Sequence, residues 1–353
     1  MPPRRRTGVV TKMKKVRAGI IGCGNIHSLH AYSVRALDHA ELVAVCDERK
    51  ERAEKTAEAF SCRAYTDWKE MVLAPDIDVI HICTPHYLHA PMAIFALENG
   101  KDVLTEKPMA IHIEDAEAMN EAARKSGRTL GVIFQNRWNP GSRLAKEIMV
   151  SGRLGKVKSA RCNLYWNRPD SYYAADAWRG TWAEEGGGVI INQAIHTVDM
   201  LRWLLDSPID YVETILENRQ HPSIEVEDMA EGIVAYKNGV LTSFHLVNYY
   251  GCDENITVDI LCENGKIHME ASKATVTFSD GEVLEADNDP NEKVPFAPEK
   301  NYWGIGHYKQ IADFYDSLLK GEVPFVSGEE AIKTQALVSA MYASGKSKTR
   351  VYL

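Results

Sequence analysis

Apolar runs of four to six residues alternate with amphipathic stretches through the first 134 residues. The runs predict buried strands, at Val16–Ile21, Glu41–Cys46, Val79–Cys83, Asp102–Thr105 and Leu130–Phe134. Helical patterns lie between them, at Ile26–Leu37, Glu48–Phe60, Leu88–Glu98 and Ile113–Ser126. Buried strands joined by helices are typical of a parallel sheet covered on both faces. We therefore expect residues 15–137 to form a doubly wound α/β domain.

The pattern changes after residue 138, where the strands become longer and polar and apolar positions alternate. A turn signal at Asn238-Gly239 separates two such strands, Met229–Lys237 and Val240–Tyr250. Helical patterns occur at Pro140–Val150, Val189–Leu205, Ile305–Lys320 and Glu329–Ala343. We expect residues 138–353 to form a second, α+β domain with a largely antiparallel open sheet, and residues 287–300 to form a surface loop.

Composition narrows the function classes. The net charge is −8, from 41 Lys+Arg against 49 Asp+Glu, which argues against a nucleic-acid partner. The basic cluster within residues 1–14 predicts a disordered tail. No apolar run reaches the roughly 18 residues that a membrane span needs. The seven cysteines form no CxxC pair, so we expect free thiols and a cytoplasmic protein.

The segment that starts at Gly22 follows the first strand directly and opens a helix. Glycine at 22 permits a tight turn, glycine at 24 lets the backbone approach a pyrophosphate, and the helix N-terminus supplies amide donors. A histidine stands where the fingerprint usually has its third glycine. The pattern predicts a dinucleotide site made by Gly22, Cys23, Gly24, Asn25 and Ile26.

Asp47 ends the second strand, 23 residues after Gly24, where a carboxylate can bind the adenosine ribose hydroxyls. A carboxylate there repels a 2′-phosphate, which favours NAD over NADP, although the nearby Arg49 can soften that preference. The alternative is that Asp47 only caps the following helix.

Two segments carry the candidate chemistry. Lys107 follows the strand that ends at Thr105, at the sheet edge where such domains bind ligands, and Glu106 can hold its amine against a reacting oxygen. Asn192 and His196 follow a triple glycine and are four residues apart, which places both on one face of a helix. His196 can exchange a proton with an alcohol while Asn192 binds a hydroxyl. The alternatives are an exposed lysine and a structural histidine.

These features together resemble the glucose–fructose oxidoreductase, inositol dehydrogenase and rhizopine-catabolism (Gfo/Idh/MocA) family, over about residues 15–353. The resemblance rests on the order and spacing of Gly22-Cys23-Gly24-Asn25, Thr84-Pro85-His86-Tyr87-Leu88-His89, Glu106-Lys107-Pro108, Trp178-Arg179, the glycines at 186–188, Asn192 to His196, and Gly306-His307. It implies an N-terminal Rossmann domain, a C-terminal domain that binds substrate, and a sugar or cyclitol substrate.

The resemblance also implies roles for individual residues. Lys107 and His196 are the expected catalytic pair, with Asn192 beside them. The expected cofactor cleft is lined by Thr84, Pro85, His89, Glu106, Lys107, Pro108, Gln135, Trp178 and Arg179, with a cis peptide bond before Pro108. The expected substrate-binding residues are Lys107, Arg168, Asn192, His196 and His307. Arg168 is expected there on its own chemistry, because arginine suits a carboxylate or phosphate of the substrate. The alternative is an ordinary exposed arginine.

The chain departs from the common family pattern at two positions, with Asn192 in place of aspartate and His86 where asparagine is frequent. The missing carboxylate removes a negative charge that would favour a protonated His196 or Lys107. The sequence therefore leaves open which of the two accepts the proton. We expect His196 to act as the acid and base, with Lys107 as its electrostatic partner.

The leading hypothesis is an NAD-dependent oxidoreductase that transfers a hydride between nicotinamide and a secondary alcohol or ketone of a sugar, sugar derivative or cyclitol. One alternative is an NAD-dependent redox-assisted glycosidase. Another is a non-catalytic dinucleotide-sensing regulatory protein, which would be expected to lack Lys107 and His196. We expect no metal, nucleic acid or membrane partner, and we expect a homodimer or homotetramer formed through the C-terminal sheet.

Overall fold

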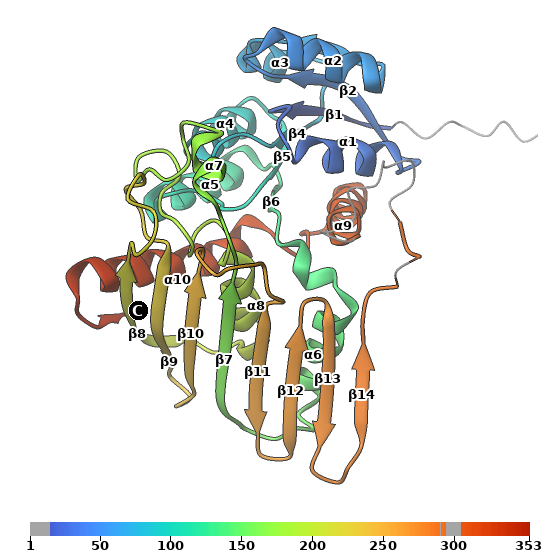
Figure 1. The fold of residues 1–353 in the computed structure, drawn as a ribbon. Helices are drawn as coiled ribbons and strands as arrows, with labels where there is room; N and C mark the ends of the chain where they lie inside the picture. The colour runs from blue at the N-terminus through green and yellow to red at the C-terminus, as the bar shows by residue number, and fades with distance from the viewer. Residues whose placement is uncertain (1–14, 290, 294–304) are drawn as a thin grey trace, which may run out of the picture.

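Two sheets organise the chain, one in each half of the sequence (Figure 1). The computed structural model describes residues 15–289, 291–293 and 305–353. The expected tail at residues 1–14 lies outside the described residues, and so do residues 290 and 294–300 of the expected surface loop. In the described part of the chain, no helix is both long enough and apolar enough to cross a membrane.

The first sheet has six strands in the order β3-β2-β1-β4-β5-β6, and every pairing is parallel. The strands are β1 (Val16–Ile21), β2 (Ala40–Cys46), β3 (Arg63–Tyr65), β4 (Val79–Ile82), β5 (Asp102–Thr105) and β6 (Leu130–Val132). The helices are α1 (His27–Arg35), α2 (Lys50–Phe60), α3 (Trp68–Leu73), α4 (His89–Glu98) and α5 (Ile113–Ser126). Two single turns of 3₁₀ helix follow at His86–Leu88 and Gln135–Trp138. The expected doubly wound parallel sheet is confirmed.

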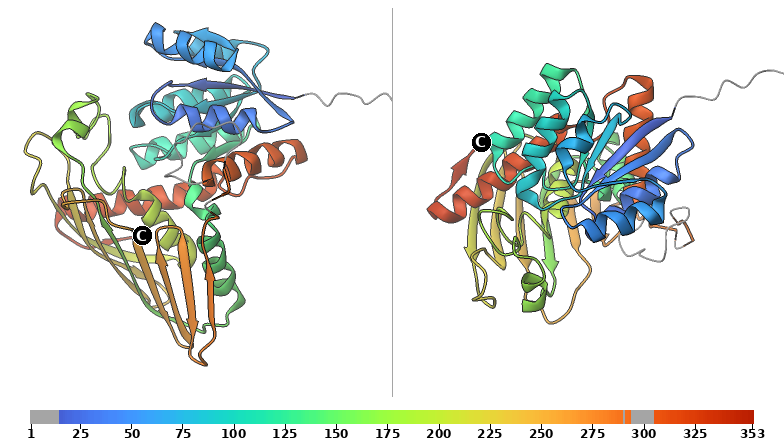
Figure 2. Two further views of the ribbon diagram at one scale, coloured as in Figure 1. Left: turned by 45° about the vertical axis from the view of Figure 1, so that its right-hand side comes forward. Right: turned by 90° about the horizontal axis from the view of Figure 1, so that it is seen from above.

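Successive residues of β1 point to opposite faces of this sheet, because side chains alternate along a strand. Ile20 packs in one core with Phe314 and Tyr315, while Ile21 packs in the other with Met71 of α3. Phe314 and Tyr315 belong to α9 (Gly306–Lys320), which therefore returns from the second half of the chain to cover the first sheet (Figure 2).

Within the described residues, the second sheet has nine strands in the order β14-β13-β12-β11-β7-β10-β9-β8-β15. They are β7 (Val157–Tyr165), β8 (Ile209–Glu217), β9 (Met229–Tyr236), β10 (Leu241–Val247), β11 (Thr257–Cys262), β12 (Gly265–Glu270), β13 (Lys273–Phe278), β14 (Val283–Ala286) and β15 (Val351–Tyr352). Only the pairing of β7 with β10 is parallel among those of the described strands. The expected largely antiparallel sheet is confirmed.

Helices cover one face of the second sheet, namely α6 (Pro140–Ser151), α8 (Ile195–Leu205) and α10 (Gly328–Ser347). The short α7 (Asp170–Ala174) lies in the long connection after β7. The opposite face carries exposed side chains such as Glu213 and Ile215 of β8. The expected association through this face stays a prediction.

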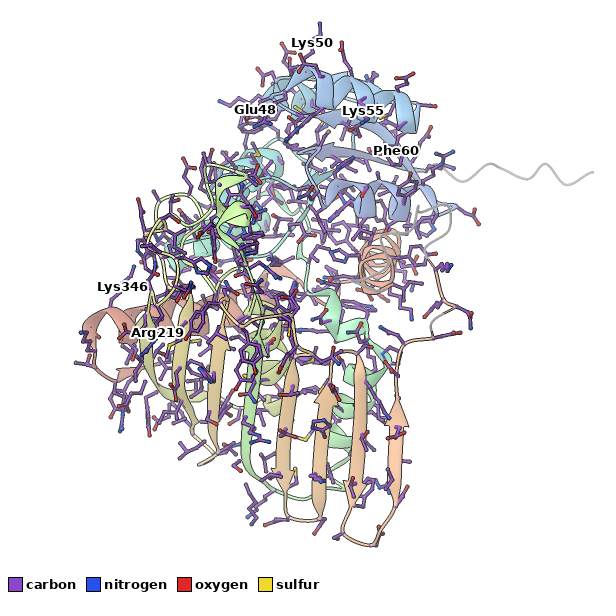
Figure 3. All side chains as sticks on the ribbon, viewed as in Figure 1. Glu48, Lys50, Lys55, Phe60, Arg219 and Lys346 are labelled. Carbon is purple, nitrogen blue, oxygen red and sulfur yellow. The ribbon has the colours of Figure 1, made fainter. Side chains whose placement is uncertain are left out.

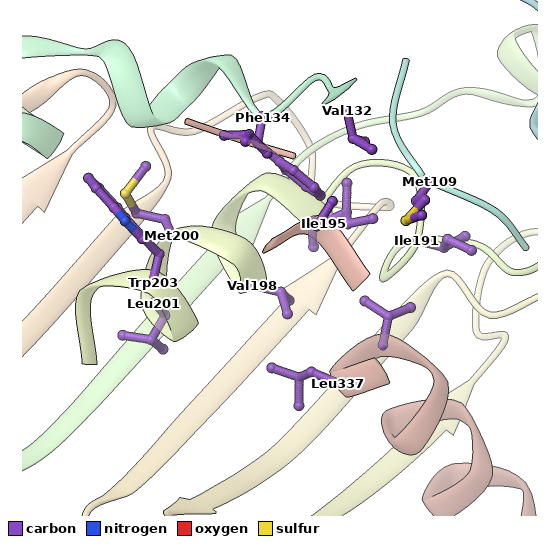
Figure 4. Close-up of a cluster of buried hydrophobic side chains, with 14 of the residues drawn as sticks. Met109, Val132, Phe134, Ile191, Ile195, Val198, Met200, Leu201, Trp203 and Leu337 are labelled. Carbon is purple, nitrogen blue, oxygen red and sulfur yellow. The ribbon is translucent and has the colours of Figure 1, made fainter. Parts of the chain in front are cut away.

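The N-terminal and C-terminal parts of the chain share one continuous apolar core (Figure 4). Phe134 of the first domain and Ile195 of α8 are both buried in it, together with Leu337 of α10. Charged side chains project instead from the outer surface, among them Lys55 on α2 and Lys346 on α10 (Figure 3). The shared core fixes the first domain against α8, the helix that carries His196.

Candidate active site

A cleft of about 1180 Å³ lies between the glycine turn after β1 and the segments that precede and begin α8. Most of the expected site residues line it. They are Gly22, Gly24, Asn25, Ile26, Asp47, Arg49, Thr84, Pro85, Glu106, Lys107, Gln135, Arg168, Trp178, Arg179, Asn192, His196 and His307. The fold therefore brings together residues that are up to 285 positions apart in the sequence.

The glycine turn has the geometry that its sequence predicts. Gly22 has φ +93°, and a Cβ there would lie 2.5 Å from the carbonyl oxygen of Cys83. Beside Gly24 the space is open, since a Cβ would meet no atom within 4 Å. A ligand can therefore approach the backbone at Gly24, while Gly22 packs against the neighbouring strand end.

The Asp47 carboxylate holds this turn in place. Oδ2 accepts a hydrogen bond from the backbone N–H of Cys23 at 2.9 Å, and Oδ1 accepts one from Arg49 N–H at 2.9 Å. The N-cap of α2 is Arg49, so Asp47 does not cap the helix by the usual contact. Cys23 contributes its backbone, because its side chain is buried.

His89 and Pro108 lie behind the cleft wall. His89 is fully buried, and its ring nitrogens lie 2.7 Å from the carbonyl oxygen of Pro108 and 2.9 Å from that of Thr84. His89 therefore lies between two loops that line the cleft, and both of its ring nitrogens are directed toward carbonyl oxygens of the protein. The cis peptide bond before Pro108 is present, as the resemblance implied.

Lys107 enters the cleft with its amine held on one side. Nζ donates to the backbone oxygen of Asn192 at 2.8 Å and to Oδ1 of the same residue at 3.0 Å. Among the described residues, these contacts use two of the three tetrahedral positions around Nζ and leave one for a ligand. Burial lowers the pKa of Lys107 to about 8, against the opposing charge of Glu106.

Asn192 is not on the helix, and this corrects the expected helix at Val189–Leu205. Helix α8 begins only at Ile195, and Asn192 lies in the preceding turns. The reason lies in the triple glycine, where a Cβ on Gly187 would meet the Tyr342 hydroxyl at 2.0 Å. Because they have no side chains, the glycines let the backbone pack closely against the protein core. The resulting turn directs Asn192 toward Lys107.

His196 stands in the first turn of α8 and faces the same cleft. Burial lowers its pKa to about 3, and the charge of Lys107 adds to the effect. Its Nε2 lies 3.5 Å from Nε2 of Gln135. Among the described residues, the buried polar atoms of the cleft walls without a hydrogen-bond partner include Nδ1 of His196, Oε1 of Gln135 and Oγ1 of Thr84.

Both halves of the chain match known protein families. Residues 16–134 match the family described as "Oxidoreductase family, NAD-binding Rossmann fold", and residues 142–268 match the "GFO/IDH/MocA C-terminal domain". The chain belongs to the Gfo/Idh/MocA family. Its N-terminal part is an NAD-binding Rossmann domain, and the protein is an oxidoreductase that acts on CH–OH groups.

Proteins similar to this Gfo/Idh/MocA protein include two inositol dehydrogenases and a dehydrogenase of known structure. Inositol 2-dehydrogenase 3 of Saccharopolyspora erythraea is 30% identical, over 77% of this chain and 78% of the relative. Myo-inositol 2-dehydrogenase of Thermotoga maritima is 25% identical, over 96% and 98%. The WlbA dehydrogenase from Bordetella pertussis, solved in complex with NADH and UDP-GlcNAcA, superposes with a TM-score of 0.84 at 29% identity, covering 96% of this chain and 99% of that chain.

The Gfo/Idh/MocA cleft has a buried polar chain behind Glu106 that the sequence analysis missed. Oε1 of Glu106 lies 3.0 Å from Nε2 of His30 and 3.2 Å from Nε2 of His307. Nδ1 of His30 lies 2.8 Å from Nδ1 of His81, and Nε2 of His81 lies 2.8 Å from the Tyr315 hydroxyl. Burial favours a neutral Glu106, but these hydrogen bonds outweigh it and hold its pKa well below the usual range.

Three of these groups could in principle hold a metal ion, because ligand atoms of His30, Glu106 and His307 lie within 4.8 Å of one another. The same atoms are already hydrogen-bonded to one another, so hydrogen bonds account for their placement.

One wall of the cleft, formed by residues 166–179, consists of alternating aromatic and cationic side chains. The Arg168 guanidinium lies 4.6 Å from the Trp166 ring centroid and 5.6 Å from that of Tyr172, and Arg179 follows at 4.3 Å from Tyr172 and 4.6 Å from Trp178. Arg168 also donates from Nη1 to the Asp253 carboxylate. Its charge is therefore paired, and the expected contact with a substrate anion stays a prediction.

Sequence reasoning also missed Tyr172 and Glu185. The Tyr172 hydroxyl lies 3.2 Å from Nδ2 of Asn192 and 3.1 Å from Nε2 of Gln193. Glu185 is 1% exposed and accepts from the same Nδ2 of Asn192. The one available signal was position, since Glu185 directly precedes the triple glycine.

Proposed function

We propose that the protein is an NAD-dependent dehydrogenase that oxidises a secondary alcohol of a sugar, sugar derivative or cyclitol, or reduces the matching ketone. The observation that carries the proposal is the Lys107 amine, which is held by Asn192 with one position left toward the cleft. The relatives named above act on inositols, and the WlbA structure holds a nucleotide-linked sugar acid, so they support this substrate class.

The residues present fit a dinucleotide. The open space at Gly24 and the first turn of α1 would receive the pyrophosphate, and Asp47 would bind the adenosine ribose. The unpartnered Oγ1 of Thr84 and Oε1 of Gln135 supply polar groups farther along the cleft. When bound, NAD supplies the hydride acceptor for alcohol oxidation.

Lys107 is the group best suited to take the alcohol proton. A pKa of about 8 leaves a substantial neutral fraction near neutral pH, and the free position on Nζ then carries the lone pair. His196, with its pKa lowered to about 3 by burial, stays neutral and binds the same oxygen through a ring nitrogen. This assignment exchanges the roles that the sequence suggested, because burial affects the histidine more than the lysine.

The substrate half of the cleft suits a polyhydroxylated ring. The faces of Trp166, Tyr172 and Trp178 offer apolar surface for the C–H bonds of such a ring. The amide and guanidinium groups between them can bind its hydroxyls.

A substrate panel tests the proposal. Inositols, free sugars, sugar acids, glycosides and nucleotide-linked sugars are incubated separately with NAD and with NADP, and the reduced cofactor is followed by absorbance. We expect reduction of NAD with at least one class, and loss of the signal on the order of 10²-fold in Lys107→Met. Lys55→Met, an exposed lysine of α2, should retain the activity. Silence across the panel together with no binding of NAD would contradict the proposal.

A further inference from the structure

The side chain of Asn192 connects two charged groups that do not touch each other. Its Oδ1 accepts from Nζ of Lys107 at 3.0 Å, and its Nδ2 donates to Oε1 of Glu185. Glu185 is 1% exposed, and its other oxygen accepts from the backbone N–H of Gly180. A buried carboxylate therefore lies one amide away from the amine.

The neighbours fix the orientation of this amide. If Oδ1 and Nδ2 of Asn192 were exchanged, an amide N–H would face the donor Nζ of Lys107 and the amide oxygen would face the Glu185 carboxylate. Both contacts would be repulsive. An ionised Glu185 therefore aims Oδ1 at Lys107, and it does so only while it can accept the hydrogen bond from Nδ2.

We propose that Glu185 is a positioning residue for the hydride-transfer reaction: through Asn192 it fixes the Lys107 amine and supplies the negative charge that balances the ammonium form. The inference rests on the proposed function for its catalytic meaning. The amide relays the orientation, and the carboxylate charge acts on Nζ across it through an environment with little water.

The other charged groups around Lys107 do not cancel the effect of the Glu185 charge on the pKa of Lys107. Glu106, the residue before it, also raises the pKa of Lys107, while Arg179 and Arg168 in the aromatic wall lower it. The imidazoles of His86 and His196 stay neutral because burial holds their pKa values below the ordinary range. The amine thus faces two carboxylates and two guanidinium groups, and removing one carboxylate leaves an excess of positive charge.

Burial raises the pKa of Glu185 above its ordinary value. Four neighbours oppose this rise and favour the carboxylate, first the hydrogen bonds from Gly180 and Asn192 and then the charges of Arg179 and Lys107. The hydroxyl of Tyr172 lies 3.2 Å from Nδ2 of Asn192 and completes the surroundings of that amide.

The test measures the ionisation of Lys107 without using catalysis. The protein is labelled with a small amine-reactive reagent over a range of pH, and modification of Lys107 is quantified by mass spectrometry of its peptide. In the unchanged protein we expect a midpoint near the value of about 8. Glu185→Gln should lower the midpoint by about one pH unit, because the ammonium form loses its balancing charge.

A charge relocation distinguishes electrostatics from a structural role. In the double variant Glu185→Gln with Asn192→Asp, a carboxylate lies directly beside Nζ, and we expect the midpoint to return to or above that of the unchanged protein. Asn192→Asp alone turns an oxygen toward the Glu185 carboxylate, so the two carboxyl groups should share one proton and the midpoint should stay near that of the unchanged protein. If Glu185→Gln does not fold, the double variant carries the test, because it restores the charge beside Nζ. Glu217→Gln, an exposed carboxylate of β8, is the control and should change nothing.

Two outcomes would overturn the inference: an unchanged midpoint in folded Glu185→Gln, or a double variant displaced as far as the single one. Binding of NAD, followed by fluorescence, is measured on every variant and should stay within about threefold of the unchanged protein. If the substrate panel failed while the midpoints shifted as expected, the proposed function would be wrong and the electrostatic link would stand.

Discussion

Nε2 of His30 lies 3.0 Å from Oε1 of Glu106. An ionised carboxylate only accepts, so the proton of the His30 ring is on Nε2 and its Nδ1 must accept from His81. His81 then carries its proton on Nδ1, and its Nε2 accepts from the Tyr315 hydroxyl. These hydrogen bonds are all donated in one direction, from Tyr315 through His81 and His30 to the carboxylate of Glu106, the residue before Lys107.

This direction predicts the tautomers of the two histidines. Nitrogen-15 NMR should report the Nε2–H form for His30 and the Nδ1–H form for His81. Burial lowers the pKa of both rings below the ordinary value, so both should stay neutral at and above about pH 7. A ring that carries a second proton at that pH, or one equivalent of metal in the purified protein that is lost in His30→Gln, would contradict the hydrogen-bonded chain.

The pH dependence of alcohol oxidation should follow the ionisation of Lys107. The neutral amine accepts the proton, so with a pKa of about 8 the rate should be low below that pH, half-maximal near it and constant above it. Ketone reduction should show the opposite limb, because it needs the ammonium form. The measurement is kcat against pH in both directions. A rate of oxidation that stays flat from about pH 6 to pH 9 would show that Lys107 does not accept the proton.

Replacement of Asp47 should change cofactor preference. In Asp47→Ala, NAD should bind about tenfold or more weakly, because the ribose loses a charge-assisted hydrogen bond and the turn loses its tie to Cys23. NADP should lose less, because a carboxylate that repels the 2′-phosphate is also removed. The ratio of the two dissociation constants is the readout. Asp280→Ala removes a similar aspartate from the exposed β13–β14 turn and should leave the ratio unchanged.

Alanine at position 187 should disturb the turn that presents Asn192. A Cβ there would lie 2.0 Å from the Tyr342 hydroxyl, which also accepts from Ile191 N–H and donates to Glu227. We expect Gly187→Ala to cost about 1–3 kcal/mol of unfolding free energy, measured by urea denaturation, and to lower kcat as well. Gly251→Ala, whose Cβ would meet no atom within 4 Å, is the control. Equal stability of the two variants would contradict the close packing.

The local pattern of apolar and polar residues was sufficient to predict most of the fold. The apolar runs at Val16–Ile21 and Asp102–Thr105 and the helix at Ile113–Ser126 end where expected, because each carries a strong periodic signal and clear boundaries. Strand β3 and helix α3 were missed. The strand has three residues and two of them are exposed, so no apolar run marks it.

The site was less accessible to sequence reasoning. Motif spacing identified Lys107, Asn192 and His196, but the helix it implied around Asn192 was wrong because packing at the glycines overrides local helical preference. Glu185 gains its role only from a contact across the turn, and His81 only from a tyrosine 234 residues away. Such groups look like ordinary core residues until the fold brings them together.

The central claim is that a hydride leaves a carbon bearing a hydroxyl and reaches the nicotinamide in this cleft. The most direct test uses the best substrate of the panel with deuterium on that carbon, and locates the label by mass spectrometry and NMR. We predict that the deuterium appears at C4 of the released reduced cofactor and that Lys107→Met abolishes the transfer. Deuterium that stays in the sugar-derived product during turnover, with no labelled reduced cofactor released, would contradict the account.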